Sequence, residues 1–394
     1  MMVLTLRSLI CCCMNLMFNF SVIMKRYESL DILRGLTVAL MILVNNGAGS
    51  VRFATLSHAS WEGVTLCDLV FPTFIFCAGV AMAFSLAHFD CFNKDVSKKI
   101  FRRGLIIFLL GLVLNAFPFY PLHQDPSMTF GENYISWLSH IRIMGVLQRI
   151  AICYVIGSIL VLTLKKTSRI IGVIIGLSVV YTGILVLFGP VVGAFSYECN
   201  VANDINTFLL GKDHVYKVLT RPDGSLIGFD PEGIVDTLSA ICTILIGFLS
   251  GRIIRETSTK EEAALKIFAW SAVCTASGLF LSTWVPMIKK IWTTSYMLYA
   301  AGSSMAMLSL LIYVVDIKKK SQWFYPFKAM GMNPLVLYCM SWILAVTLTG
   351  IIGFDKNAVF GGNEWTSLLY SLLFVSVHLV TGILLYKKRI FIKI

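Results

Sequence analysis

The chain has 394 residues, of which 57% are hydrophobic and 14% are charged, and its formal net charge is +12. Soluble domains carry about 25% charged residues, so this composition excludes a soluble globule and indicates a polytopic membrane protein. The positive charge does not indicate nucleic-acid binding, because the basic residues lie in short loops between apolar segments, where they determine orientation.

The apolar N-terminal stretch, residues 1–23, contains Arg7 and three consecutive cysteines but no small-residue cleavage site of a signal peptide. Met24 is followed by a basic flank and is a natural start. We therefore treat residues 1–23 as a mis-assigned leader or an additional helix. Residues 24–394 then form one transmembrane domain.

Ten apolar segments follow Met24, each of about 20 residues, which is the length that a helix needs to cross a ~30 Å hydrocarbon core. The leader would provide an eleventh span. The fold class is therefore all-α, a polytopic transmembrane helical bundle. The predicted spans are residues 30–49, 69–88, 102–118, 143–164, 170–190, 234–254, 265–285, 293–315, 328–350 and 366–386.

Lysine and arginine are distributed unequally between alternate loops. One set of loops contains 22 of them, and the other set contains seven. Because cytoplasmic loops are enriched in these residues, both termini are predicted to be cytoplasmic. The segment around His58 and the loop 191–233 then lie on the extracytoplasmic side, where this loop is large enough to form a small lid.

The first span contains Asp31, Arg34 and Asn45. Asp31 and Arg34 are three residues apart and can pair on one helix face. Arg34 and Asn45 project in the same direction, about 16 Å apart along the helix axis. This stripe suits an extended ligand that is charged at one end and reactive at the other. The alternative is a structural ion pair and an amide that bonds a neighbouring helix.

The segment that joins the first two spans contains His58, Trp61, Glu62 and Asp68. Polar groups next to lipid are costly, and an imidazole titrates near neutral pH, so His58 is the candidate catalytic base. Trp61 offers an apolar face for a ligand or serves as an interfacial anchor.

The fourth span opens with Arg142 and Arg149, which are seven residues apart and share one helix face. Arginines near lipid need partners, and Glu62, Asp68 and Glu232 lie on the same side as candidates. A structural ion-pair network and contact with a ligand are both compatible with this pattern.

In the eighth span, Trp292, Ser295 and Tyr296 follow helical spacing. An aromatic belt at the membrane interface explains the rings but not Ser295. In the ninth span, Asn333 precedes Pro334, so its amide could simply mend a proline kink. The eleven cysteines show no paired metal-ligand spacing, and we predict no metal site.

Eight motifs occur in order between about residues 25 and 390. They are Asp31-Ile-Leu-Arg-Gly35, Val44-Asn45, His58-Ala-Ser-Trp-Glu-Gly63, Asp68-Leu-Val-Phe-Pro72, Val146-Leu-Gln-Arg149, Asp230-Pro-Glu-Gly233, Trp292-Thr-Thr-Ser-Tyr296 and Gly331-Met-Asn-Pro334. Together they resemble the heparan-α-glucosaminide N-acetyltransferase family, a group of transmembrane acyltransferases. The chain is more similar to the short bacterial members, because the large lumenal N-terminal domain is missing. One departure is Met144, where the family pattern has proline.

The resemblance implies transfer of acetyl from cytoplasmic acetyl-CoA to the amine of a glucosamine-type sugar or glycosaminoglycan fragment on the far side. Position by position, it implies that His58 is the general base and Asn45 its partner. Asp68 either fixes the tautomer of His58 or binds the acceptor ammonium. The expected location is a bacterial inner membrane, and a homodimer is left open.

The remaining site assignments divide between the two substrates. Acetyl-CoA is assigned Arg34, Trp292, Ser295 and Asn333. The acceptor is assigned Trp61, Glu62, Arg149 and Glu232. Two alternatives stay open, an O-acyltransferase of a surface polysaccharide and a proton-coupled solute transporter built on Asp31 and Arg34.

Overall fold

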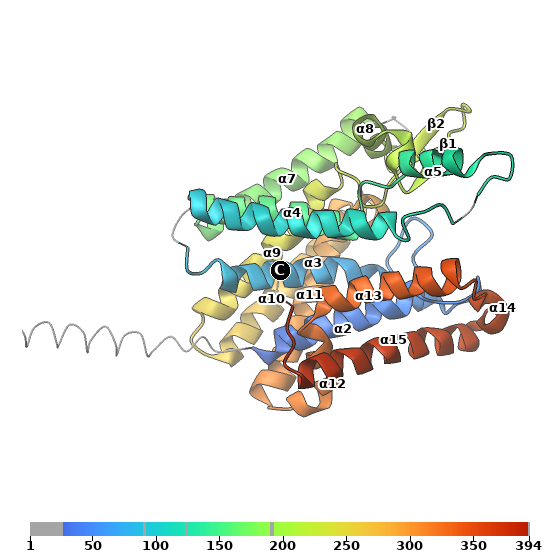
Figure 1. Cartoon of the computed structure of the whole chain (residues 1–394). Coiled ribbons are helices and arrows are strands. Elements are labelled where there is room, and N and C mark those ends of the chain that lie inside the picture. Colours follow the sequence, from blue (N-terminus) through green and yellow to red (C-terminus); the bar gives the residue numbers. More distant parts are fainter. Residues whose placement is uncertain (1–26, 90–91, 123, 190–192, 393–394) are drawn as a thin grey trace, which may run out of the picture.

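The computed structural model describes residues 27–89, 92–122, 124–189 and 193–392, so the N-terminal leader lies outside the described residues. The chain forms a helical bundle with one short hairpin (Figure 1). Within the described residues, eight helical stretches are long and apolar enough to cross a membrane. They are α3 Leu66–Ser85, α6 Val146–Leu164, α7 Thr167–Phe188, α9 Thr237–Glu256, α10 Lys260–Leu281, α11 with its π-helical extension at Thr294–Ile317, α13 with its π-helical extension at Pro334–Ile351, and α15 Glu364–Lys387. The predicted all-α membrane bundle is confirmed.

The first and third predicted spans are also helices, α2 Glu28–Asn45 and α4 Lys94–Ala116. The first has three charged residues among its 18, and the second has six among its 23. The ninth predicted span is interrupted. The short helix α12 Tyr325–Gly331 ends just before Pro334, which starts α13. A proline suits the first turn of a helix because its nitrogen has no hydrogen to leave unpaired.

The central helices α3 and α9 are mostly buried, whereas α7, α10, α13 and α15 expose most of their apolar surface on the outside of the bundle. Glycines let α3 and α9 approach closely. A Cβ at Gly247 would lie 2.2 Å from the carbonyl oxygen of Phe76, and a Cβ at Gly79 would lie 2.1 Å from that of Ile244. Small residues are the usual means of close helix packing in membranes.

At one end of the bundle, Asp316 in the π-helical segment Ile312–Ile317 receives the first turn of α2. Its carboxylate accepts hydrogen bonds from the backbone N–H groups of Glu28 and Ser29, each at 3.2 Å. Lys260 lies 3.2 Å from the same carboxylate. An acidic group stabilises a helix N-terminus, and this contact therefore anchors α2.

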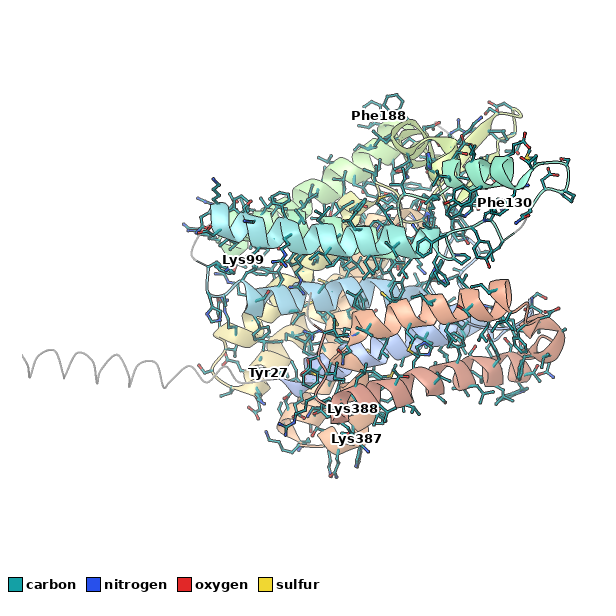
Figure 2. The ribbon with its side chains drawn as sticks, viewed as in Figure 1. Tyr27, Lys99, Phe130, Phe188, Lys387 and Lys388 are labelled. Atoms are coloured by element: carbon teal, nitrogen blue, oxygen red, sulfur yellow. The ribbon has the colours of Figure 1, made fainter. Side chains whose placement is uncertain are left out.

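The opposite end of the bundle carries the segment around His58, and we call it the His58 end. Several short elements gather there (Figure 1). They are α5 Phe130–Ser139, α8 Val201–Leu210, the antiparallel strands β1 Lys217–Thr220 and β2 Leu226–Phe229, the 3-10 helices η1 Ala54–Leu56, η2 Lys212–His214 and η3 Lys289–Ile291, and α14 Lys356–Phe360. In Figure 2, Tyr27 and Lys99 lie at one end and Phe130 lies at the other. The described part of the loop 191–233 is thus a folded unit, which we call the lid segment (residues 193–233).

The glycine contact predicts that Gly247→Leu destabilises the bundle, because a side chain there must displace the α3 backbone. The expected cost is at least about 1–3 kcal/mol, as for overpacked cores. Thermal unfolding of the detergent-solubilised protein measures it. Gly176→Leu on α7 is the matched control, since nothing lies within 4 Å of that position. Equal melting temperatures for the two variants would contradict this packing.

Candidate active site

The carboxylate of Asp68 organises the His58 end. The sequence Thr65-Leu-Cys-Asp68 forms a capping box at the start of α3, the local pattern that begins a helix. The carboxylate accepts hydrogen bonds from the N–H groups of Ala59 and Thr65, both at 3.1 Å, and from the Thr65 hydroxyl at 3.0 Å. The loop that carries His58 is therefore folded back onto the helix.

His58 completes this arrangement, with its Nδ1 lying 2.7 Å from Asp68 Oδ1. The carboxylate side chain is only 1% exposed, and it is surrounded by donors, so we assign the proton to Nδ1 of the neutral ring. The other nitrogen, Nε2, then carries a lone pair. Since the His58 side chain is 45% exposed, this nitrogen can accept a proton from a molecule that binds at the bundle end.

Lys289 and Cys67 also contact the imidazole. Lys289 Nζ lies 2.9 Å from Nδ1 and 3.4 Å from Asp68 Oδ1, and Cys67 Sγ lies 3.1 Å from Nδ1. The sequence analysis did not assign Lys289 to the site. A signal was present, since Lys289 and Lys290 form a basic doublet in a loop set that is otherwise poor in lysine.

Trp61 contacts the lid segment. Its indole N–H donates to the Phe195 carbonyl at 2.7 Å, and its ring packs against Tyr197 and Phe229 with centroid distances of 4.8 and 6.2 Å. Lys290 lies over the Trp61 ring, and burial lowers the pKa of Lys290. Trp61 therefore joins the His58 loop to the lid segment, and part of its ring surface is already covered.

Arg142 forms a buried ion-pair network with the lid segment. Its guanidinium donates to Asp230 at 2.6 and 2.9 Å and also to Glu232. Burial alone would raise the pKa of Glu232, but the neighbouring Arg142 outweighs it and lowers that pKa. Glu232 was among the predicted partners of this arginine pair, whereas Asp230 was not.

Arg149 is fully buried, whereas the Arg142 side chain is partly exposed. It donates to the Gly233 carbonyl at 3.1 Å, lies 3.7 Å from Asp236, and stacks over Trp292 at 5.1 Å from the ring centroid. Burial raises the pKa of Asp236 to about 7. The guanidinium has no solvent-accessible surface, so it supports the lid segment and the wall beneath the site.

Trp292 and Ser295 are interior residues, and the interpretation of Trp292 as part of an interfacial belt is wrong. Trp292 is 1% exposed, and its ring packs edge-on against Phe71 and Tyr296. Ser295 donates to the carbonyl of Pro286 at 3.1 Å. The reason is the tertiary position of α11, which packs on α3 so that the Tyr296 hydroxyl donates to the Asp68 backbone carbonyl at 2.6 Å.

The other predicted site residues lie apart from His58. Asn45 ends α2 with an exposed side chain, and its amide has no hydrogen-bond partner among the described residues. Glu62 is also exposed. Arg34 lies 3.2 Å from Asp31, the pairing that the sequence predicts. Asn333 binds the C-terminal segment through the Ile390 carbonyl and the Ile392 N–H, both at 2.9 Å.

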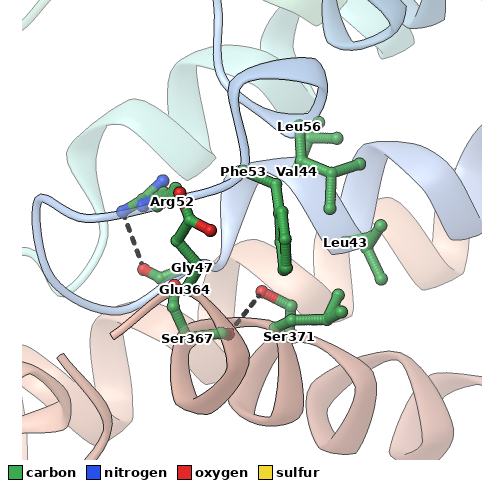
Figure 3. Close-up of a pocket in the computed structure, with 10 residues that line it drawn as sticks. Leu43, Val44, Gly47, Arg52, Phe53, Leu56, Glu364, Ser367 and Ser371 are labelled. Carbon is green, nitrogen blue, oxygen red and sulfur yellow. Dashed lines mark hydrogen bonds between the residues drawn. The ribbon is translucent and has the colours of Figure 1, made fainter. Parts of the chain in front are cut away.

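Two cavities lie between helices of the bundle. The smaller, about 20 Å³, lies between the end of α2, the loop before His58 and the start of α15. In its close-up, Arg52 bonds the Gly47 carbonyl and Phe53 points toward α15 (Figure 3). The larger, about 650 Å³, is an apolar groove between α4 and α13. Within the described ranges, no group of three or more His, Cys, Asp or Glu side chains could hold a metal ion.

Comparison with known proteins shows which proteins this chain is similar to. The family model described as "Heparan-alpha-glucosaminide N-acetyltransferase, catalytic" matches residues 26–198. The human heparan-alpha-glucosaminide N-acetyltransferase is 25% identical over 430 residues, which cover 96% of this chain and 61% of that protein. The mouse protein is 24% identical, with 94% and 61% coverage. The chain is therefore similar to heparan-alpha-glucosaminide N-acetyltransferases over most of its length.

The chain spans about three fifths of the length of these curated relatives. The part matched by the family model includes α2 to α7 and hence His58, Asp68 and Arg149. Lys289 and Glu232 lie C-terminal to it. The candidate site is therefore assembled from the matched region and from segments that follow it.

The ion-pair network predicts that Arg142→Leu detaches the lid segment. Removing one member of a buried pair costs about 3–5 kcal/mol, because the other charges stay buried and unpaired. Hydrogen exchange of residues 226–236 should accelerate. Arg221→Leu is the matched control, because its partner Asp204 is 45% exposed and such a pair contributes under about 1 kcal/mol. Unchanged exchange in Arg142→Leu would show that the network does not hold the lid segment.

Proposed function

We propose that the protein is an integral-membrane acetyltransferase that moves acetyl from acetyl-CoA to the amine of a glucosamine-type sugar. The observation that carries this proposal is the His58–Asp68 pair. It presents a half-exposed imidazole at one end of a membrane bundle whose residues 26–198 match the catalytic model of heparan-alpha-glucosaminide N-acetyltransferases. The matched human and mouse relatives are named for this reaction.

The chemistry follows from the protonation of the pair. A sugar ammonium must lose its proton before its nitrogen can attack a thioester, and His58 Nε2 is the acceptor for that proton. The amine nitrogen then bonds to the thioester carbon, and the carbon–sulfur bond breaks. The ammonium proton taken up first by Nε2 is released to solvent before attack. As the carbon–nitrogen bond forms, the attacking nitrogen gives a second proton to Nε2, which passes it to the departing sulfur, while the proton on Nδ1 stays against Asp68 throughout.

Asn45 is the proposed donor to the thioester oxygen, on which negative charge develops during attack. Its free amide at the end of α2 supports this role, since donors aimed at a developing oxyanion contribute strongly to catalysis. Apo geometry often leaves such contacts open until the substrate binds. Direct transfer and an acetyl-histidine intermediate both use the same two residues.

The acceptor residues take different parts in this proposal. Glu62 is exposed four residues after the base in the same loop and suits the acceptor ammonium or hydroxyl groups. Trp61 offers the ring edge that the lid segment leaves open. Glu232 and Arg149 act indirectly in this proposal. Glu232 is already paired with Arg142, and Arg149 already donates to the Gly233 carbonyl.

Acetyl-CoA enters from the cytoplasmic side in this proposal, and His58 lies on the extracytoplasmic side. The excess of lysine and arginine in one set of loops supports this orientation. Arg34 lies within α2 between the two ends and suits an anionic part of the donor. Trp292 and Ser295 would shape the wall of its path, and Asn333 would hold the C-terminal segment near its entrance. A bacterial inner membrane is part of the same proposal.

His58→Ala should insert normally and lose transfer by at least about 10²-fold, the usual cost of removing a general base. Turnover of labelled acetyl-CoA with glucosamine-ended oligosaccharides measures the effect at matched expression. His140→Ala is the matched control, because that histidine is 58% exposed on α5's C-terminal side, away from Asp68. Wild-type turnover in His58→Ala would remove the imidazole from the mechanism.

The identity of the acceptor atom separates the proposal from its alternatives. We expect label on the sugar nitrogen when membranes are given labelled acetyl-CoA and a panel of amino sugars and N-acetylated controls. Label on oxygen alone would instead support an O-acyltransferase of a surface polysaccharide. Uptake of sugar into vesicles without acetyl-CoA, and without an acetylated product, would support the transporter.

A further inference from the structure

Lys289 is the cation that contacts both members of the His58–Asp68 pair among the described residues. Its Nζ lies 2.9 Å from His58 Nδ1 and 3.4 Å from Asp68 Oδ1. The side chain is 18% exposed, so solvent screens it only partly. Neither the reaction scheme above nor the motif comparison assigns this lysine a role.

The charges of this group decide the state of the imidazole. A buried carboxylate beside a histidine favours the imidazolium, which cannot accept a proton and would repel the ammonium of an acceptor. The ammonium of Lys289 opposes that tendency, because it places a positive charge 2.9 Å from Nδ1. Since Nδ1 is assigned the proton that Asp68 accepts, this contact is between charges and is not a hydrogen bond to Nδ1, and the ammonium pairs with Asp68 Oδ1. With Asp68 negative and Lys289 positive, the group is electrically neutral only when the imidazole is neutral.

We propose that Lys289 is a positioning residue that keeps His58 in its neutral form, so that Nε2 is available as the base. The proposal rests on the proposed function for its catalytic meaning. Its physical content, the effect of Lys289 on protonation of His58, stands on the contacts alone.

Other charged or titratable groups around the imidazole do not substitute for Lys289. Lys290 is held away by its bond to the Ser60 carbonyl, and Glu232 is paired with Arg142. Three side chains contact the imidazole, namely Asp68 and Cys67 of α3 and Lys289 of η3. Around them, Tyr296 of α11 bonds the Asp68 carbonyl, Lys290 bonds the Ser60 carbonyl, Arg52 acts electrostatically on Cys67, and Glu232 of the lid segment does so on Lys289.

The backbone around Lys289 is fixed by the same loop that carries the base. The Gly63 N–H donates to the Met287 carbonyl at 2.9 Å, and Gly63 forms a parallel bridge with Ile288. Directly after η3, Trp292 adopts a left-handed conformation with φ of 48°. A buried aromatic residue takes that conformation only where its surroundings enforce it. The turn thereby aims Lys289 at His58.

The test compares Lys289→Met, which keeps the length and removes the charge, with Lys289→Arg, which keeps the charge. The measurement is kcat/KM for acetyl transfer to glucosamine between pH 5 and 9 in detergent. Without the cation, His58 binds a proton at higher pH, so the acidic limb of the Lys289→Met profile should move up by about one pH unit. Lys289→Arg should keep the wild-type midpoint.

Lys212→Met is the matched control, since it removes an exposed lysine from η2 at the same bundle end and changes the net charge equally. Its profile should coincide with that of the wild type. The inference is overturned if the acidic limb of the Lys289→Met profile keeps the wild-type midpoint and activity falls equally at every pH. Lys289 would then have only a structural role.

A second measurement does not require catalysis. Diethyl pyrocarbonate modifies the neutral imidazole, and mass spectrometry of the peptide that contains His58 gives the rate of its labelling against pH. The midpoint for Lys289→Met should again lie about one pH unit above that of the wild type. The labelling midpoints of Lys289→Met and the wild type can differ as expected even when the wild type transfers no acetyl. In that case the proposed function fails and the role of Lys289 stands. Coincident labelling curves overturn the role of Lys289 whatever the activity.

Discussion

A single buried carboxylate holds the candidate site together. Asp68 lies in the first turn of α3 and receives bonds from His58, Ala59 and Thr65. A carboxylate removed from water must be hydrogen-bonded on both oxygens, or the cost of burial is not offset. The same group therefore caps a helix, closes the preceding loop and orients an imidazole. These three functions cannot be separated, because they use one side chain.

The rigidity behind this carboxylate comes from helix packing inside the membrane. Lipid provides no hydrophobic drive for helices to associate, so close contact and buried hydrogen bonds must do so. Gly247 brings α9 against α3, and the Tyr296 hydroxyl ties α11 to the Asp68 carbonyl. The base is thus mounted on the central helices. The surface above it is formed by the lid segment, which is held through Arg142 and Trp61.

Arg142 and Arg149 at the His58 end each face carboxylates of other segments. Arg142 is matched with Asp230 and Glu232, and Arg149 faces Asp236. The sequence suggested Glu232 as a partner because both segments were predicted on one side of the membrane. It gave no reason to choose Asp230 or Asp236, since their approach to the arginines depends on how the lid segment folds over α6.

The sequence alone determined features that local spacing controls. Apolar segments of sufficient length became helices, Asp31 and Arg34 paired three residues apart, and the capping pattern at Thr65 began α3. The tertiary structure decided which distant residues meet. Lys289 reaches His58 across 231 positions, and Trp292 is buried among helices and does not lie at the membrane interface. Such contacts depend on the angles at which helices cross and on the folds of long loops, and no local periodicity specifies either of these.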